Sequence, residues 1–253
     1  MVAQRIAKYD VGEFIGGGMS HVYRATDTEA NRTVALKLMS EAALADSDAR
    51  ARFLHEAELT SGLQHPNIIR VFDYGESDGR PYIALELLEG ESLRAAVEGN
   101  RAGDVAQRIR IARQAAEALA YLHQRKIIHR DIKPENIHID RTCHARLMDF
   151  GIAGVAGEAA ALAGATAGTP YYMSPEQVLG QPLTQQADIY SFGVLLYELF
   201  TGISELVKAN PDTRWFIAGH SRGAMLAARY ARESATNIAG LILIGTTHPR
   251  GGR

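Results

Sequence analysis

The stretch His129-Arg-Asp-Ile-Lys-Pro-Glu-Asn136 places an acid, a base and an amide within eight residues and has neither helical nor strand periodicity. It is therefore predicted to be a loop that carries chemistry. Asp131 can accept a proton from a hydroxyl, Lys133 can neutralise a phosphate, and the carbonyl oxygen of Asn136 can bind a hard cation. Thirteen residues later, Asp149-Phe-Gly151 places a second carboxylate on a glycine turn, where it can bind the same cation.

These two motifs resemble the protein kinase superfamily, and specifically the bacterial (Hanks-type) Ser/Thr kinases. One such tripeptide would occur by chance, but the order and spacing of the two motifs are specific. The resemblance implies an α+β fold of two lobes, with an antiparallel sheet in the N-lobe and a mainly helical C-lobe. It implies transfer of the γ-phosphoryl group of ATP to protein hydroxyls. Asp131, Lys133 and Asn136 would be catalytic, and Asn136 and Asp149 would bind Mg²⁺.

The composition indicates a globular protein. Of the 253 residues, 46% are apolar, enough for a large core, and the net charge is −2. This charge argues against binding to nucleic acid or membranes through overall charge. The single cysteine, Cys143, excludes an internal disulfide framework and suits a reducing compartment. No signal peptide or membrane segment is expected, which predicts a cytoplasmic location; the oligomeric state is not predicted.

A glycine-rich turn, Gly16-Gly17-Gly18-Met-Ser-His21, joins two strand-like runs at residues 9–15 and 22–26. Such a turn lets backbone amides approach phosphates closely. The resemblance implies that these three glycines and Val22 bind ATP. However, the loop is one residue shorter than is usual in the family, which alters its geometry over the phosphates.

A predicted strand ending at Lys37 places Ala35 on the same face as the lysine. The resemblance implies that both residues bind ATP. A solvated lysine would be the ordinary alternative. Residues 47–63 are predicted to form a helix with Glu56 near its middle. The resemblance implies that Glu56 pairs with Lys37 to hold the α- and β-phosphates. Glu58 is the alternative partner, but the Phe53-Leu-His-Glu-Ala context favours Glu56.

Two further strands are predicted at residues 68–74 and 81–87, around a turn at Ser77-Asp-Gly-Arg80. The second strand leads into a segment that resembles the hinge between kinase lobes. The resemblance implies that the backbone of Glu86 and Leu88 faces adenine, with His138 beneath the ring. A buried edge strand followed by a helix is the structural alternative. His138 stands where the family usually has an aliphatic residue, and a neutral imidazole is expected in such a slot.

Two long helices are predicted in the second half. The first spans residues 104–124 and begins with Asp104-Val-Ala-Gln107, which resembles a capping box. Its predicted buried face contains Val105, Ile109, Ala112, Ala116 and Leu119. The second spans residues 188–202 and is apolar almost all round, so it should be central. The resemblance implies that Asp188, at its start, holds the backbone of the catalytic loop.

The stretch between Gly151 and Gly168 is rich in alanine and glycine, and it resembles the activation segment of kinases. Its end, Gly168-Thr-Pro-Tyr-Tyr-Met-Ser-Pro-Glu176, has Ser-Pro-Glu where the family has Ala-Pro-Glu. Thr166 is the candidate for regulatory phosphorylation, with Arg130 as the partner of the phosphate. Thr169 is an equally good candidate, although it more often positions the substrate hydroxyl.

The resemblance to kinases stops near Gly202. A strand, Gly219-His-Ser221-Arg-Gly223, a helix and a second strand follow, and this order resembles the nucleophile elbow of α/β-hydrolases. Ser221 would be the nucleophile. The only acid and histidine after it are Glu233 and His248, and no oxyanion loop precedes it, so esterase activity is not expected.

The sequence therefore predicts a kinase N-lobe at residues 9–88, a partial C-lobe at 89–202 and an α/β-hydrolase-like β-α-β fragment at 203–253. We expect the fragment to pack against residues 188–200 in place of missing helices. The expected function is that of an ATP-dependent Ser/Thr protein kinase. The alternatives are a catalytically impaired, nucleotide-binding pseudokinase or chimera, and a serine hydrolase that uses Ser221.

Overall fold

The computed structural model describes residues 5–17, 20–150, 154–155, 172–201, 215–220 and 238–244. These residues fall into two compact units. The first extends to Leu195, and the second holds the end of the last helix and the two C-terminal strands. The predicted packing of the tail against residues 188–200 stays a prediction.

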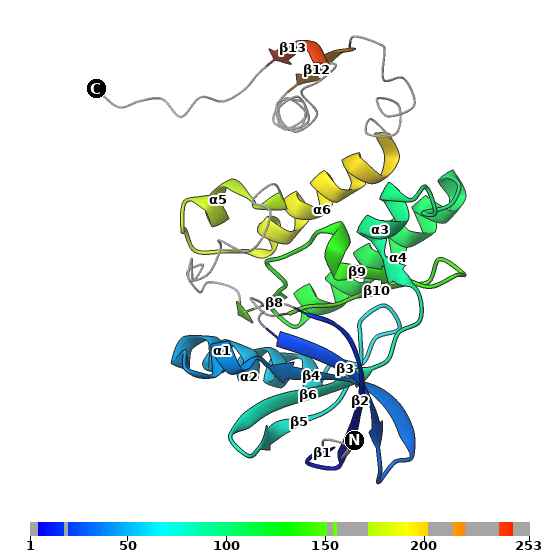
Figure 1. Cartoon of the computed structure of the whole chain (residues 1–253). Helices are drawn as coiled ribbons and strands as arrows, with labels where there is room; N and C mark the ends of the chain where they lie inside the picture. Colours follow the sequence, from blue (N-terminus) through cyan, green and yellow to red (C-terminus); the bar gives the residue numbers. More distant parts are fainter. Residues whose placement is uncertain are drawn as a thin grey trace. The chain divides into compact units, whose positions relative to one another are not determined.

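A six-stranded antiparallel sheet forms the first part of the chain, in the order β1-β2-β3-β4-β6-β5 (Figure 1). The three strands predicted between residues 9 and 37 are confirmed, and each is longer than predicted. The sheet consists of β1 (Arg5–Ile6), β2 (Tyr9–Gly17), β3 (Ser20–Asp27), β4 (Arg32–Met39), β5 (Val71–Ser77) and β6 (Arg80–Glu86).

Strand β4 separates two hydrophobic cores because its side chains alternate between the faces of the sheet. Leu36 and Leu38 belong to one core, together with Tyr9. Met39 belongs to the other, where it packs with Phe53 of helix α2. The alternation therefore directs Lys37 to the same face as Met39, toward the helix.

Helix α2 (Ser47–Ser61) follows the short helix α1 (Glu41–Leu44) and packs against β5 and β6 (Figure 1). Asp46 caps its start, because its carboxylate accepts hydrogen bonds from the backbone N–H groups of Asp48 and Ala49. The helix ends two residues earlier than predicted, before Gly62.

Strands β5 and β6 are joined by a two-residue turn, Asp78-Gly79, in which both φ angles are positive, at 50° and 77°. This is the turn geometry that suits the twist of a hairpin. Strand β5 begins at Val71, three residues later than predicted. Ile68 instead forms an isolated parallel bridge with Leu147, because this part of the chain pairs with the second half of the molecule.

The rest of the first unit contains short strands and most of the helices. Helix α6 reaches from the first unit into the second. The elements are β7 (Glu91–Ser92), α3 (Leu93–Glu98), α4 (Val105–Gln124), β8 (Ile127–Ile128), the 3₁₀ turn η1 (Pro134–Asn136), β9 (Ile137–Ile139), β10 (Ala145–Leu147), β11 (Gly154–Val155), α5 (Pro175–Val178) and α6 (Gln185–Thr201).

Helix α4 has the predicted bounds and the predicted Asp104 cap, but the prediction of its buried face was wrong. Val105 and Ile109 are 66% and 55% exposed, and of the five predicted residues only Leu119 is fully buried. The buried stripe begins six residues after Val105 and contains Ile111, Ala115, Ala118 and Leu122. The first turns of the helix extend past the packed region, and the many alanines give the two faces little contrast.

Two C-terminal strands, β12 (Trp215–His220) and β13 (Ile238–Ile244), pair in parallel, with Phe216 opposite Gly240. Both predicted strands are confirmed. The helix predicted between these two strands lies outside the described residues, and so does Ser221.

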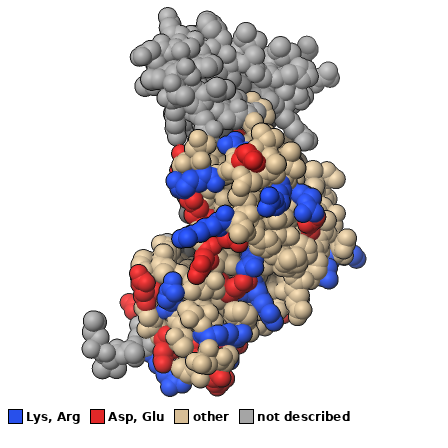
Figure 2. Space-filling model, turned by 90° about the vertical axis from the view of Figure 1, so that its right-hand side faces the viewer, with Lys and Arg blue, Asp and Glu red and all other residues tan. Residues whose placement is uncertain are grey.

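Acidic and basic side chains are interspersed on the face of the molecule shown in Figure 2. No helix among the described residues is both long and apolar enough to span a membrane.

Candidate active site

The structure brings Lys37 of β4 and Glu56 of α2 together, as predicted. The Lys37 Nζ lies 2.7 and 3.0 Å from the two carboxylate oxygens of Glu56, and both side chains are almost buried. Burial alone would lower the pKa of Lys37, but the charges of Glu56 and Asp149 outweigh it and leave the pKa above its ordinary value. Glu58 is exposed, so Glu56 is the partner.

Asp149 completes this cluster from the second half of the chain. Its Oδ1 lies 3.4 Å from the Lys37 Nζ, and its side chain is 54% exposed. Its φ angle of 55° is in the left-handed region, which is unusual for a non-glycine residue. The next residue, Phe150, is buried, with its ring centroid 4.7 Å from that of His129. This packing holds the turn that presents the Asp149 carboxylate.

The three predicted catalytic residues form a second cluster. The Asp131 Oδ2 lies 2.7 Å from the Lys133 Nζ and accepts a hydrogen bond of 2.8 Å from the Asn136 Nδ2. The same amide nitrogen donates to the Asp131 carbonyl at 2.9 Å. The carboxylate that could accept a proton is therefore fixed from two sides.

The same bonds orient Asn136 for a cation. Because its amide nitrogen is engaged by Asp131, its carbonyl oxygen Oδ1 faces the other way. The backbone N–H of Met148 donates to the backbone carbonyl of Asn136 at 2.8 Å. This hydrogen bond joins the segment that carries Asn136 to the segment that carries Asp149. One amide and one carboxylate oxygen suit Mg²⁺, which takes few protein ligands and completes its shell with phosphate and water. The described residues contain no group of three or more His, Cys, Asp or Glu arranged for a metal.

Asp188 of α6 holds the backbone of the catalytic loop, as predicted. It is fully buried and accepts hydrogen bonds from the N–H groups of His129 and Arg130 at 2.9 and 2.8 Å. The His123 Nε2 lies 2.7 Å from the same carboxylate. Arg130 has a left-handed φ of 67°, so these bonds stabilise a strained backbone.

Sequence reasoning missed a second support of this loop. The Gln177 side chain donates to the Arg130 carbonyl at 2.7 Å. Gln177 is itself held in a capping box with buried Ser174, which starts α5. The Ser-x-x-Gln pattern was a readable signal for this cap. The serine of Ser-Pro-Glu therefore has a structural role that alanine could not provide.

Arg94 of α3 is another residue of the site that was not predicted from the sequence. It pairs with Glu135 of the catalytic loop at 2.9 Å and donates to the Tyr172 hydroxyl at 2.5 Å. The Tyr172 carbonyl accepts a bond of 2.6 Å from Ser191 of α6. Tyr172, where the described chain resumes within the end of the activation segment, is thereby fixed next to the loop.

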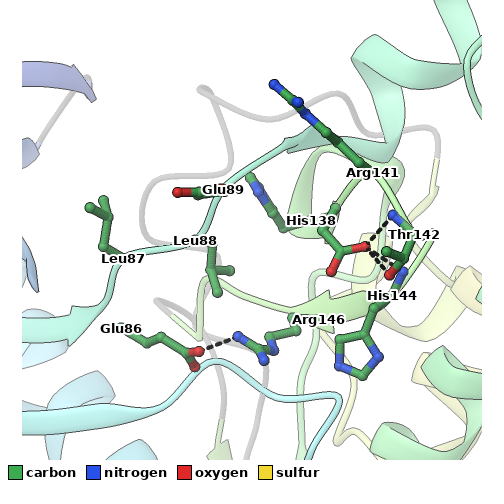
Figure 3. Close-up of a pocket in the computed structure, with 10 residues that line it drawn as sticks. Glu86, Leu87, Leu88, Glu89, His138, Arg141, Thr142, His144 and Arg146 are labelled. Carbon is green, nitrogen blue, oxygen red and sulfur yellow. Dashed lines mark hydrogen bonds and ion pairs between the residues drawn. The ribbon is translucent and has the colours of Figure 1, made fainter.

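The predicted adenine-binding residues Glu86, Leu88 and His138 line one pocket of about 360 Å³ (Figure 3). Burial lowers the pKa of His138, and its Nε2 is buried without a hydrogen-bond partner among the described residues. A neutral imidazole follows, as predicted. Lys37, Asp131 and Asp149 do not line this pocket.

The glycine turn is only partly described. Gly16 and Gly17 end β2 and pair with Val22 and His21. A Cβ atom on Gly17 would lie 2.0 Å from the Ser20 carbonyl oxygen, so only glycine fits there. Ala35 is buried. Gly18 lies outside the described residues, as do Thr166 and Thr169, and their roles stay predictions.

Most of the chain, including all of the residues in this site, is similar to one known protein family. Residues 9–235 match the protein kinase domain family. The chain belongs to the protein kinase family. Its antiparallel N-terminal sheet fits a kinase N-lobe, and the matched region reaches 33 residues past Gly202 (235 − 202), into the segment predicted to be hydrolase-like.

Curated proteins that are similar to this kinase domain include bacterial Ser/Thr kinases. The chain is 37% identical to the serine/threonine-protein kinase PknB of Mycobacterium leprae over 81% of its length, and 38% identical to PrkC of Bacillus subtilis over 80%. It is 36% identical to pkn2 of Myxococcus xanthus over 89%. The aligned regions cover 34%, 32% and 28% of these proteins, so the chain spans about a third of their length.

Proposed function

We propose that this chain transfers the γ-phosphoryl group of ATP to serine or threonine hydroxyls of a protein substrate, with Mg²⁺ as cofactor. The observation that carries this proposal is the connection between two clusters. Asp131, Lys133 and Asn136 form one, and the Met148 N–H joins Asn136 to the strand that leads to Asp149, which contacts Lys37.

Asp131 would act as the general base. It would take the proton of the acceptor hydroxyl as that oxygen bonds to the γ-phosphorus, and the bond from this phosphorus to the β–γ bridging oxygen would break to release ADP. Lys133, 2.7 Å from Asp131, would neutralise the γ-phosphate. The contact with Asn136 would keep the carboxylate aimed at the acceptor.

The nucleotide would be held at several points. Lys37, positioned by Glu56, would bind the α- and β-phosphates beneath Gly16, Gly17, Gly18 and Val22. The backbone of Glu86 and Leu88 would face adenine, between Ala35 and His138. Asn136 and Asp149 would hold Mg²⁺, which would neutralise the charge that develops on the phosphates.

Control by phosphorylation of Thr166 or Thr169 is a further part of the proposal. A phosphate on Thr166 could pair with Arg130, which the structure ties to both α5 and α6. Thr169 would otherwise position the substrate hydroxyl.

The proposed location is the cytoplasm. The buried, free Cys143 suits its reducing conditions.

The direct test is incubation of the chain with radiolabelled ATP, Mg²⁺ and protein acceptors, followed by phosphoamino acid analysis. Labelled phosphoserine or phosphothreonine is expected. Absence of label combined with a melting temperature raised by MgATP would instead identify a nucleotide-binding pseudokinase.

For the domain organisation, we propose an N-lobe at residues 9–88, a partial C-lobe at 89–202 and an α/β-hydrolase-type fragment at 203–253. The parallel pairing of β12 with β13 supports a β-α-β unit, because parallel strands require a crossover connection. The family match to residue 235 competes with this boundary. We expect no reaction of Ser221 with a fluorophosphonate probe, and labelling would show a working hydrolase nucleophile.

A further inference from the structure

Strand β10 is hydrogen-bonded to the segment at residues 67–69, which lies just before strand β5. The Leu147 N–H donates to the Asn67 carbonyl at 2.8 Å, and the Ile69 N–H donates to the Leu147 carbonyl at 3.0 Å. Asn67 also donates from its side chain to the Ala145 carbonyl at 2.9 Å. Asp149 follows two residues after the strand ends, so the position of β10 determines where its carboxylate lies.

Arg146, in the middle of β10, reaches two further segments. Its guanidinium forms an ion pair with Glu86, at the end of β6, and its Nε donates to the Pro66 carbonyl at 3.3 Å (Figure 3). The two charged side chains are 27% and 31% exposed, so solvent screens the pair only in part. His144 contacts the same Pro66 carbonyl at 3.0 Å, which helps to keep that loop in place.

We infer that Arg146 is a positioning residue for nucleotide binding, because its ion pair sets the span between the hinge at Glu86 and the metal-binding carboxylate of Asp149. This inference rests on the proposed function. ATP would touch the hinge through adenine and Asp149 through its metal-bound phosphates, so both ends must be correctly spaced. Adenosine would touch the hinge alone.

The hinge itself does not depend on this ion pair. The Glu86 N–H donates to the Arg70 carbonyl at 2.9 Å, and Glu86 pairs with Val34 in the sheet. Removing the Arg146 charge should therefore leave the adenine-facing backbone in place and loosen only its spacing from β10. The effect should be confined to ligands that contact both ends.

The test compares the affinities of MgATP and adenosine for Arg146→Gln by calorimetry. We expect MgATP to bind about fivefold more weakly, as for loss of a partly screened ion pair, and adenosine to change less than about twofold. Arg146→Lys keeps the charge and should recover most of the MgATP affinity. Arg141→Gln is the matched control, because Arg141 lines the same pocket but is exposed and points away from Glu86 (Figure 3).

Equal weakening of both ligands in Arg146→Gln would overturn the inference, because it would show general damage to the hinge. Unchanged MgATP affinity would overturn it as well. If the wild-type chain binds adenosine and MgATP, the proposed nucleotide site is supported even when one of these two outcomes rejects the role of Arg146. A wild-type chain that bound neither would reject that site and this inference together.

Discussion

At the scale of single residues, two of the eight described non-glycine residues with a positive φ angle lie in the proposed site. Arg130 and Asp149 both have left-handed φ angles. Each such residue costs about 1–2 kcal/mol, which neighbouring contacts must offset. Asp188 and Gln177 hold Arg130 through its N–H and carbonyl groups, and buried Phe150 anchors the turn at Asp149. The fold thus stabilises the backbone conformations that present the carboxylates of Asp131 and Asp149.

Replacing Lys37 with Met should leave Glu56 nearly buried without its partner. Loss of one member of such a pair should lower the free energy of unfolding by about 3 kcal/mol, measured by urea denaturation. Because the pKa of Lys37 is raised, the pair's contribution is complete below the ordinary lysine pKa and is lost only at more alkaline pH. The loss should therefore be constant between about pH 6 and 8. Glu58→Gln, at an exposed site, is the control; equal losses in both variants would contradict the pairing.

His138 should make stability depend on pH. Because burial lowers its pKa, the unfolded chain takes up a proton at a higher pH than the folded chain, so stability falls as pH falls through the ordinary histidine pKa. His138→Leu should reduce this loss, seen in melting temperatures from about pH 7.5 to 5.5. Some loss should remain, because burial also lowers the pKa of His65. Exposed His55→Gln is the control, and an unchanged pH profile in His138→Leu would argue against a buried neutral imidazole.

At the scale of elements, local sequence signals predicted where a helix or a turn forms better than they predicted which face of a helix is buried. The Asp104 capping box and the Asp78-Gly79 turn are encoded by adjacent residues, and both elements form where predicted. The buried face of α4 depends on which neighbours reach each turn, so Val105 and Ile109 were misassigned. The roles of Arg94 and Gln177 depend on contacts between segments far apart in sequence. The single sequence contains no direct signal for such contacts.

Asp188→Asn should disconnect α6 from the catalytic loop. The amide keeps the shape of the side chain but replaces one of the two oxygens that accept backbone N–H groups with an N–H donor. It also removes the negative charge that faces His123. We expect about 2–3 kcal/mol less stability and a lower kcat. Asp104→Ala, which removes an exposed cap, should cost about 1 kcal/mol with kcat unchanged. An active Asp188→Asn enzyme of normal stability would show that the loop needs no such support.

At the scale of the whole molecule, the sequence motifs predicted the family and the geometry of the site more securely than the C-terminal boundary. The predicted pairing of Lys37 with Glu56 is confirmed. Asp131 and Asn136 belong to one eight-residue motif, and the structure brings their side chains together. The boundary near Gly202 rests on a short serine motif and two apolar strands. The strands are present, yet the kinase family match continues to residue 235.

The measurement that tests the central claim most directly is autophosphorylation of the intact chain compared with Asp131→Asn. The amide keeps the size of the side chain but cannot act as a base, so incorporation of labelled phosphate should fall by about 100-fold or more. MgATP should still raise the melting temperature of the variant, which would show that the nucleotide site remains. Equal incorporation by both proteins would contradict the proposed role of Asp131 and the mechanism built on it.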